Sequence, residues 1–323
     1  AGSDADPFTH ADGFGGVITA LTAARTSGKP TWVPPGVYEC TDTLEILSGD
    51  HIYWDNATLK PSGLAALSNL IEIIGTSGLY KSDVKMTGLL TIDFTAMGST
   101  YVRALAWDYI KRSQFPVEIV IIGGFGNAIR GTRSHTLRLP AFVGVYERTF
   151  AEGVGSAVYL QTVANSSGLE QVYAEGCDEA VDLADCSYIT GGHITNVDGK
   201  EPIDIGSSIG CHFLSATGIR AGAGVNFKVD VGANSTGCVS NRVDRVVIVD
   251  MPADIAAVTW TNLAEGVPNE DNSVGEIECR GTHGSNTHAV RFDGYSAAYP
   301  IKRARVGRYS YTAHAGFQWR LPY

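Results

Sequence analysis

A short cassette of residues recurs along the chain and limits what the chain can fold into. Its central apolar residue returns at intervals of 22 to 32 residues, after strands and Gly- or Asn-rich turns. The central residues are Ile129, Val158, Val181, Ile203, Val229, Val258, Val290 and Phe317. Such a period indicates a solenoid. No 3.6-residue pattern follows residue 30 and one cassette repeats in register, so we predict an all-β parallel β-helix of roughly nine to ten coils.

The chain before the cassettes predicts how this β-helix begins. Apolar residues at 17, 18, 21 and 24 fit one face of a short helix within residues 10–30. We predict that residues 1–323 form a single β-helix domain in which this helix caps the first coil. Residues 31–323 would form the coils, with two long loop insertions near 95–113 and 131–155.

The opening of the chain carries a family resemblance. A short helix is followed by Thr31-Trp32-Val33-Pro34-Pro35-Gly36-Val37-Tyr38 and by a strand that ends in Ala57-Thr58-Leu59-Lys60. This stretch resembles the pectate-lyase-like right-handed β-helix superfamily, including phage tailspikes and polysaccharide depolymerases. The resemblance implies a right-handed coil, a polysaccharide substrate, a homotrimer, and a place outside the cell or on a virion surface. The catalytic motifs of polygalacturonases and pectate lyases do not occur, so no catalytic residue transfers by motif.

Composition excludes some partners. The formal net charge of −10 argues against a nucleic-acid partner, but it leaves room for an anionic sugar polymer in a local Arg-lined groove. No apolar run reaches the 18 or so residues that a membrane helix needs, so we expect no membrane insertion. The six cysteines form no CxxC or zinc pattern, and we interpret them as small buried residues.

Three aspartates occupy the same position of successive cassettes. Asp182, Asp204 and Asp230 each lie between two apolar residues, 22 and 26 residues apart. Because strand side chains alternate, an inward Val181 places Asp182 outward, and stacking would align all three in one column. The neighbouring outward column, with Ala184, Gly206 and Gly232, would leave an open floor beside the acids.

Carboxylates stacked this closely suit glycoside hydrolysis. Coils about 4.8 Å apart offer both the separation of retaining glycosidases, about 5–5.5 Å, and that of inverting ones, about 6.5–9.5 Å. Mutual repulsion keeps one group protonated as a general acid while another stays ionised. Glu179 and Glu201, two residues before the central Val181 and Ile203, are alternative acids.

Other side chains could bind the substrate. Arg130 and Arg291 lie towards the ends of the column and could hold acidic sugar groups, and Tyr159 could offer an aromatic face. His193 and His212, on the preceding strands, are further candidates beside a purely structural role. The column could instead be plain solvated surface or a calcium site. We predict no dedicated metal or cofactor, with calcium as the alternative.

We predict a glycoside hydrolase-like depolymerase that acts on a bacterial surface or extracellular glycan, resembling a phage tailspike. Asp182, Asp204 and Asp230 would supply the acid and the base or nucleophile. Two alternatives stay open. A polysaccharide lyase would remove a proton from a uronic acid, and a non-catalytic β-helix would bind a glycan without cleaving it.

Overall fold

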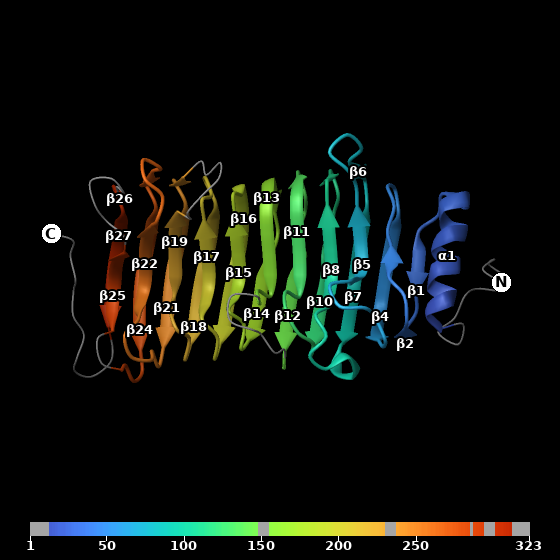
Figure 1. Cartoon of the computed structure of the whole chain (residues 1–323), viewed down its shortest axis with the longest axis horizontal. Coiled ribbons are helices and arrows are strands. Elements are labelled where there is room, and N and C mark those ends of the chain that lie inside the picture. Colours follow the sequence, from blue (N-terminus) through green and yellow to red (C-terminus); the bar gives the residue numbers. More distant parts are fainter. Residues whose placement is uncertain (1–12, 148–154, 230–236, 285–286, 294–300, 312–323) are drawn as a thin grey trace.

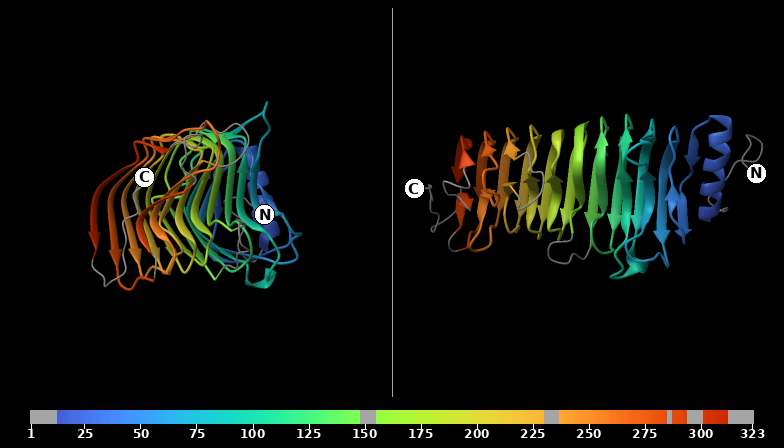
Figure 2. Two further views of the ribbon diagram at one scale, coloured as in Figure 1. Left: turned by 60° about the vertical axis from the view of Figure 1, so that its left-hand side comes forward. Right: turned by 45° about the horizontal axis from the view of Figure 1, so that its top comes forward.

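The computed structural model is a rod in which short strands stack coil upon coil, with helix α1 at one end and the last strands at the other (Figure 1). It describes residues 13–147, 155–229, 237–284, 287–293 and 301–311. Every strand pairing within the coils is parallel, and three faces of the rod meet at bends of the chain (Figure 2). The fold is the predicted right-handed parallel β-helix.

Face A of the rod contains the cassettes, and each of its strands pairs with the next one along the rod. Its strands are β3 (Leu44–Glu45), β5 (Asn69–Ile74), β8 (Arg103–Asp108), β11 (Ile129–His135), β13 (Val158–Ser167), β15 (Glu179–Ala184), β17 (Glu201–Gly206), β19 (Val225–Val229), β22 (Ala256–Asn262) and β25 (His288–Asp293).

Face C contains the strands that precede the cassettes in the chain. These are β1 (Thr31–Val33), β2 (Gly36–Cys40), β4 (His51–Pro61), β7 (Lys85–Asp93), β10 (Val117–Ile122), β12 (Phe142–Tyr146), β14 (Gln171–Glu175), β16 (Ser187–Val197), β18 (His212–Ile219), β21 (Arg242–Val249), β24 (Ser273–Arg280) and β27 (Arg305–Tyr311). The strands predicted before each cassette are confirmed here.

Face B is narrow and joins face A to face C in each coil. Its separate strands are β6 (Lys81–Ser82), β9 (Ile110–Lys111), β20 (Cys238–Val239), β23 (Asn269–Glu270) and β26 (Ile301–Lys302). In the middle of the rod, β13 and β16 are long enough to bend across this face, and the two pair there from Ala164↔Ser187 to Ser167↔Thr190.

Helix α1 (Gly13–Ser27) lies across the first coil, as predicted. Phe14, Val17 and Leu21 are buried beneath it against the open end of the core. Arg25 of its last turn forms an ion pair with the buried Asp50 at 2.7 Å. The helix therefore covers strand edges and apolar side chains that the first coil would otherwise expose.

The interior consists of columns of like side chains, because each coil places one residue at each interior position. Trp260 stacks between Phe227 and Phe292, with ring centroids 5.4 and 5.3 Å apart. Buried Asn241 donates through Nδ2 to Asn272 Oδ1 at 2.9 Å, so that polar groups in the turns are satisfied by the next coil. All six cysteines are buried free thiols, which confirms their interpretation as core residues.

The prediction that residues 95–113 and 131–155 form loop insertions is wrong over much of both intervals. Residues 103–111 form β8 and β9, and the described part of 131–155 includes most of β11 and all of β12. In Ala104-Leu105-Ala106-Trp107 all four residues are buried, so the inward–outward alternation that marks a strand is absent. A single-turn 3-10 helix, η2 (Thr95–Met97), does lie in the first interval. No helix among the described residues is long and apolar enough to cross a membrane.

Candidate active site

The column of outward residues on face A exists and includes two of the three predicted aspartates. Asp182 on β15 pairs in register with Asp204 on β17, one coil further along. Register places Tyr159 and then Arg130 on the coils before Asp182. Neighbouring members are therefore about 4.8 Å apart at their Cα atoms.

In the next coil this column continues with an asparagine. Asp204 pairs with Asn226 of β19, so the cassette of this coil is centred on Val225 and not on Val229. Asp230 itself lies outside the described residues. The same shift pairs Gly206 with Lys228 and not with Gly232, so that a cation replaces one of the small residues predicted beside the acids.

Two glutamates, predicted as alternative acids, join the aspartates in one cluster. Glu179 and Glu201 pair in register at the first positions of β15 and β17, with 9% and 6% of their surface exposed. The Ser156 hydroxyl lies 3.2 Å from Glu179 Oε2 and 3.5 Å from Asp182 Oδ2, and it connects the two acids. Asp204 is also buried, at 8%.

Lys200 lies between the two glutamates. Its Nζ is 3.4 Å from Glu179 Oε1 and 3.7 Å from Glu201 Oε1. The turn that presents Lys200 and Glu201 is fixed by fully buried Asn196, whose Nδ2 donates to the carbonyl oxygens of Cys177 at 3.0 Å and Glu201 at 2.8 Å. The cluster is therefore positioned by backbone that the core holds in place.

Glu201 differs from the other acids in its protonation. Burial raises the pKa of its carboxyl group to about 7. The positive charge of Lys200 acts against burial, whereas Glu179 and Asp182 raise the pKa further. Near neutral pH this group is therefore partly protonated, as a general acid requires.

Two neighbours of the acids are held in their protonated forms. Although burial acts in the opposite direction, the charges of Glu201 and Glu179 raise the pKa of Lys200. Burial, helped by the charge of Asp182, raises the pKa of Tyr159 to about 12. Arg130 lies over the Tyr159 ring at 5.9 Å, so this ring is covered by a cation on one side.

A cavity of about 190 Å³ adjoins the cluster on its C-terminal side. Its lining includes Glu201, Lys200, Asn226, Thr259 and Arg291. Glu201 Oε2 is buried and has no hydrogen-bond partner among the described residues. A buried polar oxygen without a partner is costly and calls for an explanation, and here it belongs to an acid that lines a cavity.

Arg291 reaches the same cavity from three coils beyond Asp204, through Asn226 and Thr259 in register. Its Nε lies 2.8 Å from Asp293 Oδ2, and its Nη1 donates to the Asp254 carbonyl oxygen at 3.3 Å.

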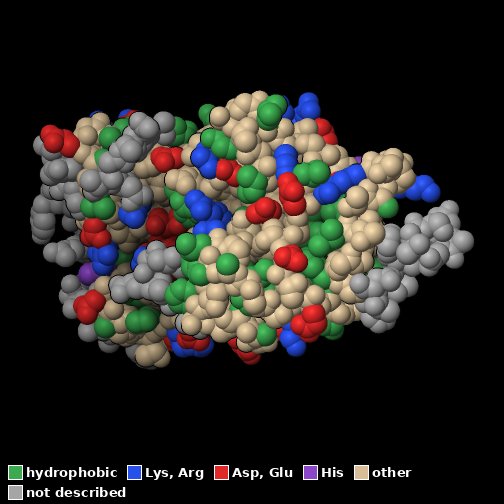
Figure 3. Space-filling model, turned by 45° about the vertical axis from the view of Figure 1, so that its right-hand side comes forward, with side chains coloured by type: hydrophobic (Ala, Val, Ile, Leu, Met, Phe, Trp, Pro, Cys, Tyr) green, Lys and Arg blue, Asp and Glu red, His purple; other side chains and the backbone are tan. Residues whose placement is uncertain are grey.

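On the face of the molecule drawn in Figure 3, acidic and basic side chains lie next to one another and do not form separate patches.

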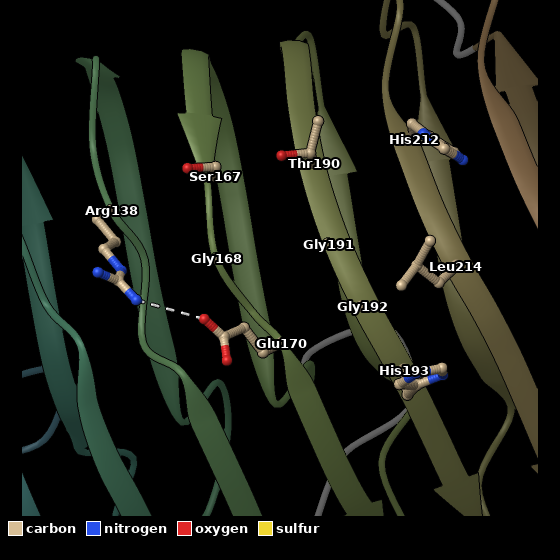
Figure 4. Close-up of a pocket in the computed structure, with 10 residues that line it drawn as sticks. All are labelled: Arg138, Ser167, Gly168, Glu170, Thr190, Gly191, Gly192, His193, His212 and Leu214. Carbon is tan, nitrogen blue, oxygen red and sulfur yellow. Dashed lines mark hydrogen bonds and ion pairs between the residues drawn. The ribbon is translucent and has the colours of Figure 1, made fainter.

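The two predicted histidines do not join the acids. His193 and His212 line a shallow trough of about 670 Å³ where face B meets face C (Figure 4). His193 Nδ1 is 2.8 Å from the Ser215 hydroxyl, and His212 Nε2 is 3.0 Å from Asp244 Oδ2. If the histidines bind sugar, they do so at a second place on the rod.

Within the part of the chain that the structure describes, no group of three or more His, Cys, Asp or Glu side chains has the arrangement of a metal site. The acid cluster itself includes the ammonium group of Lys200 between two glutamates, which is a poor substitute for a set of oxygen ligands. Calcium stays a prediction.

The fold has known counterparts. The structure is similar to that of the family 28 exopolygalacturonase of Yersinia enterocolitica, with 10% sequence identity and a TM-score of 0.51. The similarity covers 90% of this chain and 75% of the exopolygalacturonase chain. The polygalacturonase of Erwinia carotovora ssp. carotovora has 11% identity and a TM-score of 0.48, over 98% of this chain and 95% of that one. PfbA, a surface adhesin of Streptococcus pneumoniae, has 9% identity and a TM-score of 0.41, over 88% and 90%. No protein-family profile and no curated protein sequence matches the chain.

Several residues of the cluster were not predicted from the sequence. Ser156, Lys200, Asn226 and Lys228 all contact or adjoin the acids. For Lys200 the signal was its place directly before Glu201, in the turn that opens a cassette. Ser156 carries no such signal, because only the neighbouring coil brings it to Glu179 and Asp182.

Proposed function

We propose that the chain is an extracellular polysaccharide-cleaving enzyme that hydrolyses a glycosidic bond at the acid cluster of face A. The observation that carries the proposal is the Glu201 carboxyl group, which is buried beside a cavity, is partly protonated near neutral pH and adjoins the Asp182–Asp204 column. Glycosidases use a pair of carboxyl groups, one of which has a raised pKa and acts as the general acid.

In the proposed reaction Glu201 protonates the glycosidic oxygen as the bond to the anomeric carbon breaks. Asp182 or Asp204 either activates a water molecule or attacks the anomeric carbon. Ser156 orients Asp182 through its hydroxyl group, and Lys200 balances the charge that Glu201 gains when it loses its proton. Among the predicted residues, the acid role thus moves from the aspartates to Glu201.

A lyase mechanism is less well supported at this place. A lyase needs a deprotonated Lys, Arg, His or Tyr side chain as its base, whereas Lys200 and Tyr159, which adjoin the acids, both have raised pKa values and keep their protons. A non-catalytic glycan-binding role draws its support from the trough with His193 and His212, which lies apart from the acids. The tailspike-like place on a virion, and the homotrimer, stay predictions from the resemblance.

The test is to compare Glu201→Gln, Asp182→Asn and Asp204→Asn with the control Glu72→Gln. Glu72 is on β5, nearer the N-terminal end of face A than the acid cluster, and it accepts a hydrogen bond from Asn69. Each protein is incubated with polygalacturonate and with bacterial capsular and O-antigen polysaccharides, and released reducing ends are measured. We expect a loss of about 10²–10⁴-fold for Glu201→Gln and at least one aspartate variant.

The control should keep the wild-type rate on the same polysaccharide. Full activity of Glu201→Gln would refute the assignment of the acid. Products that absorb in the ultraviolet because of a new double bond would identify a lyase. Glycan binding without any release of reducing ends would favour the non-catalytic alternative.

A further inference from the structure

A second ladder of side chains runs along the corner between faces B and C, far from the acid cluster in the cross-section of the rod. Each coil contributes one residue, and parallel pairing or bridging links each residue to the next. The members in order are His51, Lys85, Gln114, Arg138, Ser167, Thr190, His212, Arg242, Ser273 and Arg305. We refer to these ten residues as the corner ladder.

The corner ladder has an unusual composition for this protein. It contains three arginines, one lysine, two histidines and four neutral polar residues, and no acid, although the whole chain has a net charge of −10. Its members are exposed or half-exposed to solvent. The residue before each member faces the interior in most coils, as Val84, Leu137, Ile189 and Cys211 do, so alternation directs the ladder outward.

The middle of the corner ladder lies in the trough shown in Figure 4. Arg138, Ser167, Thr190 and His212 are consecutive members, and all four line this hollow of about 670 Å³. Its floor has no large side chains at Gly191 and Gly192. A Cβ atom there would come within 2.4 Å of the Phe213 ring and 2.1 Å of the Glu170 carbonyl oxygen. The close stacking of coils thus requires glycine at both of these positions in the lining of the trough.

Acids beside the corner ladder neutralise it only in part. Arg138 Nη2 is 3.5 Å from Glu170 Oε1, and Asp244 accepts from Arg242 at 2.5 Å and lies 3.0 Å from His212. These pairs are solvent-exposed, so each contributes little energy and can be exchanged for contacts with a bound anion. Lys85 and Arg305 have no ion pair within the part of the chain that the structure describes.

The dimensions favour a polymer over a small anion. Ten members at roughly 4.8 Å per coil extend over about 43 Å. Arg138, Arg242 and Arg305 are four and two coils apart, which places them about 19 and 10 Å from one another along the rod, a span that only an extended ligand can bridge. Hydroxyl and amide groups at Gln114, Ser167, Thr190 and Ser273 supply donors and acceptors between the charges, as sugar hydroxyls require.

We propose that the corner ladder binds a linear anionic polysaccharide, which lies along the rod axis and is held by Arg138, Arg242 and Arg305. This binding does not depend on hydrolysis at Glu201, because the two sets of residues are on different faces. A polymer held on this corner would tether the protein to its glycan while face A acts on another segment.

The test compares two triple variants that remove the same charge. Arg138→Gln/Arg242→Gln/Arg305→Gln changes the corner ladder. The control Arg133→Gln/Arg220→Gln/Arg280→Gln removes three exposed arginines from other positions, where they are paired with Asp108, Asp198 and Glu278. Binding to polygalacturonate, dextran sulfate, neutral dextran and double-stranded DNA is measured by affinity electrophoresis and calorimetry, at low and high salt.

We expect the wild-type chain to bind one or both anionic glycans, not neutral dextran, and to bind more weakly at high salt. The ladder variant should lose about tenfold in affinity, and the control less than about threefold. Equal losses in the two variants, or no binding of either anionic glycan by the wild type, would overturn the proposal. Tighter binding of DNA than of both glycans would overturn the choice of polysaccharide. Because Glu201→Gln leaves the corner intact, its glycan affinity tells failure of this proposal apart from failure of the hydrolase proposal.

Discussion

The buried Glu201 carboxyl group should make the stability of the protein depend on pH in a way that one substitution removes. In the folded chain its pKa is raised to about 7 from an ordinary value of 4.5, mainly by burial. Replacement by glutamine keeps the size of the side chain and removes the ionisation. We therefore expect Glu201→Gln to abolish a pH-dependent loss of stability that the wild type shows.

The direction and size of this effect follow from linkage. A group whose pKa is higher in the folded state stabilises fully below its unfolded pKa, and that contribution is lost as pH rises through the folded pKa. The window is thus pH 4.5 to about 7. A shift of this size corresponds to about 3 kcal/mol at 1.36 kcal/mol for each pKa unit. Glu201→Gln should consequently gain up to about 3 kcal/mol relative to the wild type between pH 4.5 and pH 8.

The measurement is urea unfolding of both proteins at pH 4.5, 6 and 8, followed by tryptophan fluorescence after equilibrium is shown from both directions. The quantity of interest is the difference in unfolding free energy between the variant and the wild type as a function of pH. Infrared difference spectra provide a direct check, because the carbonyl band of a protonated carboxylic acid near neutral pH should be missing in the variant.

Glu179→Gln is the matched control, since it removes the partner acid in the same cluster. If Glu179→Gln removes the pH-dependent loss of stability and Glu201→Gln does not, the assignment of the raised pKa to Glu201 is wrong. If the free-energy difference between Glu201→Gln and the wild type does not change from pH 4.5 to pH 8, the argument that burial raises the Glu201 pKa is wrong. The general-acid role proposed for it would then lose its physical basis.

Two further predictions concern the interior of the coils. Trp260→Ala removes a fully buried ring stacked between two others and should cost about 3–5 kcal/mol of unfolding free energy, measured by urea unfolding. Its control is Trp32→Ala, at a ring that is 52% exposed, which should cost far less. Similar losses in the two variants would contradict the stacking argument. Asn196→Ala removes the side-chain amide that donates to the Cys177 and Glu201 carbonyl oxygens, and it should cost about 1–3 kcal/mol, measured in the same way. Gln171→Ala, at an exposed position, serves as its control.

The fold could be predicted because alternation and period are both visible in the sequence. Val181, Ile203 and Val258 each precede a polar residue of the outward column, and each proved to be an interior position of face A. The helix at the start of the chain and the strands of face C were predicted on the same grounds. Where apolar residues occupy both faces, as in 104–107, the alternation disappears and strands were taken for a loop.

The register of one coil could not be predicted for a related reason. In Val225-Asn226-Phe227-Lys228-Val229 the alternation is the same whether Val225 or Val229 is aligned with Ile203, since the two differ by four residues. Strand parity fixes which side chains face inward, but the length of the preceding turn decides which coil position they take. That turn places Asn226, not Asp230, beside Asp204, and it brings Lys228 next to Gly206.

The acid cluster and the corner ladder show why composition says little about the partners of a solenoid. Each coil adds one residue to every outward column, so one rod can carry columns of opposite charge. The net charge of the chain is the sum over all columns and hides the difference between them. The net charge of −10 therefore coexists with a column that contains no acid. An anionic polymer is repelled by the molecule as a whole at long range, but within a Debye length of about 8 Å the local column decides what binds. Charge should accordingly be read column by column in such a fold, after the register is known.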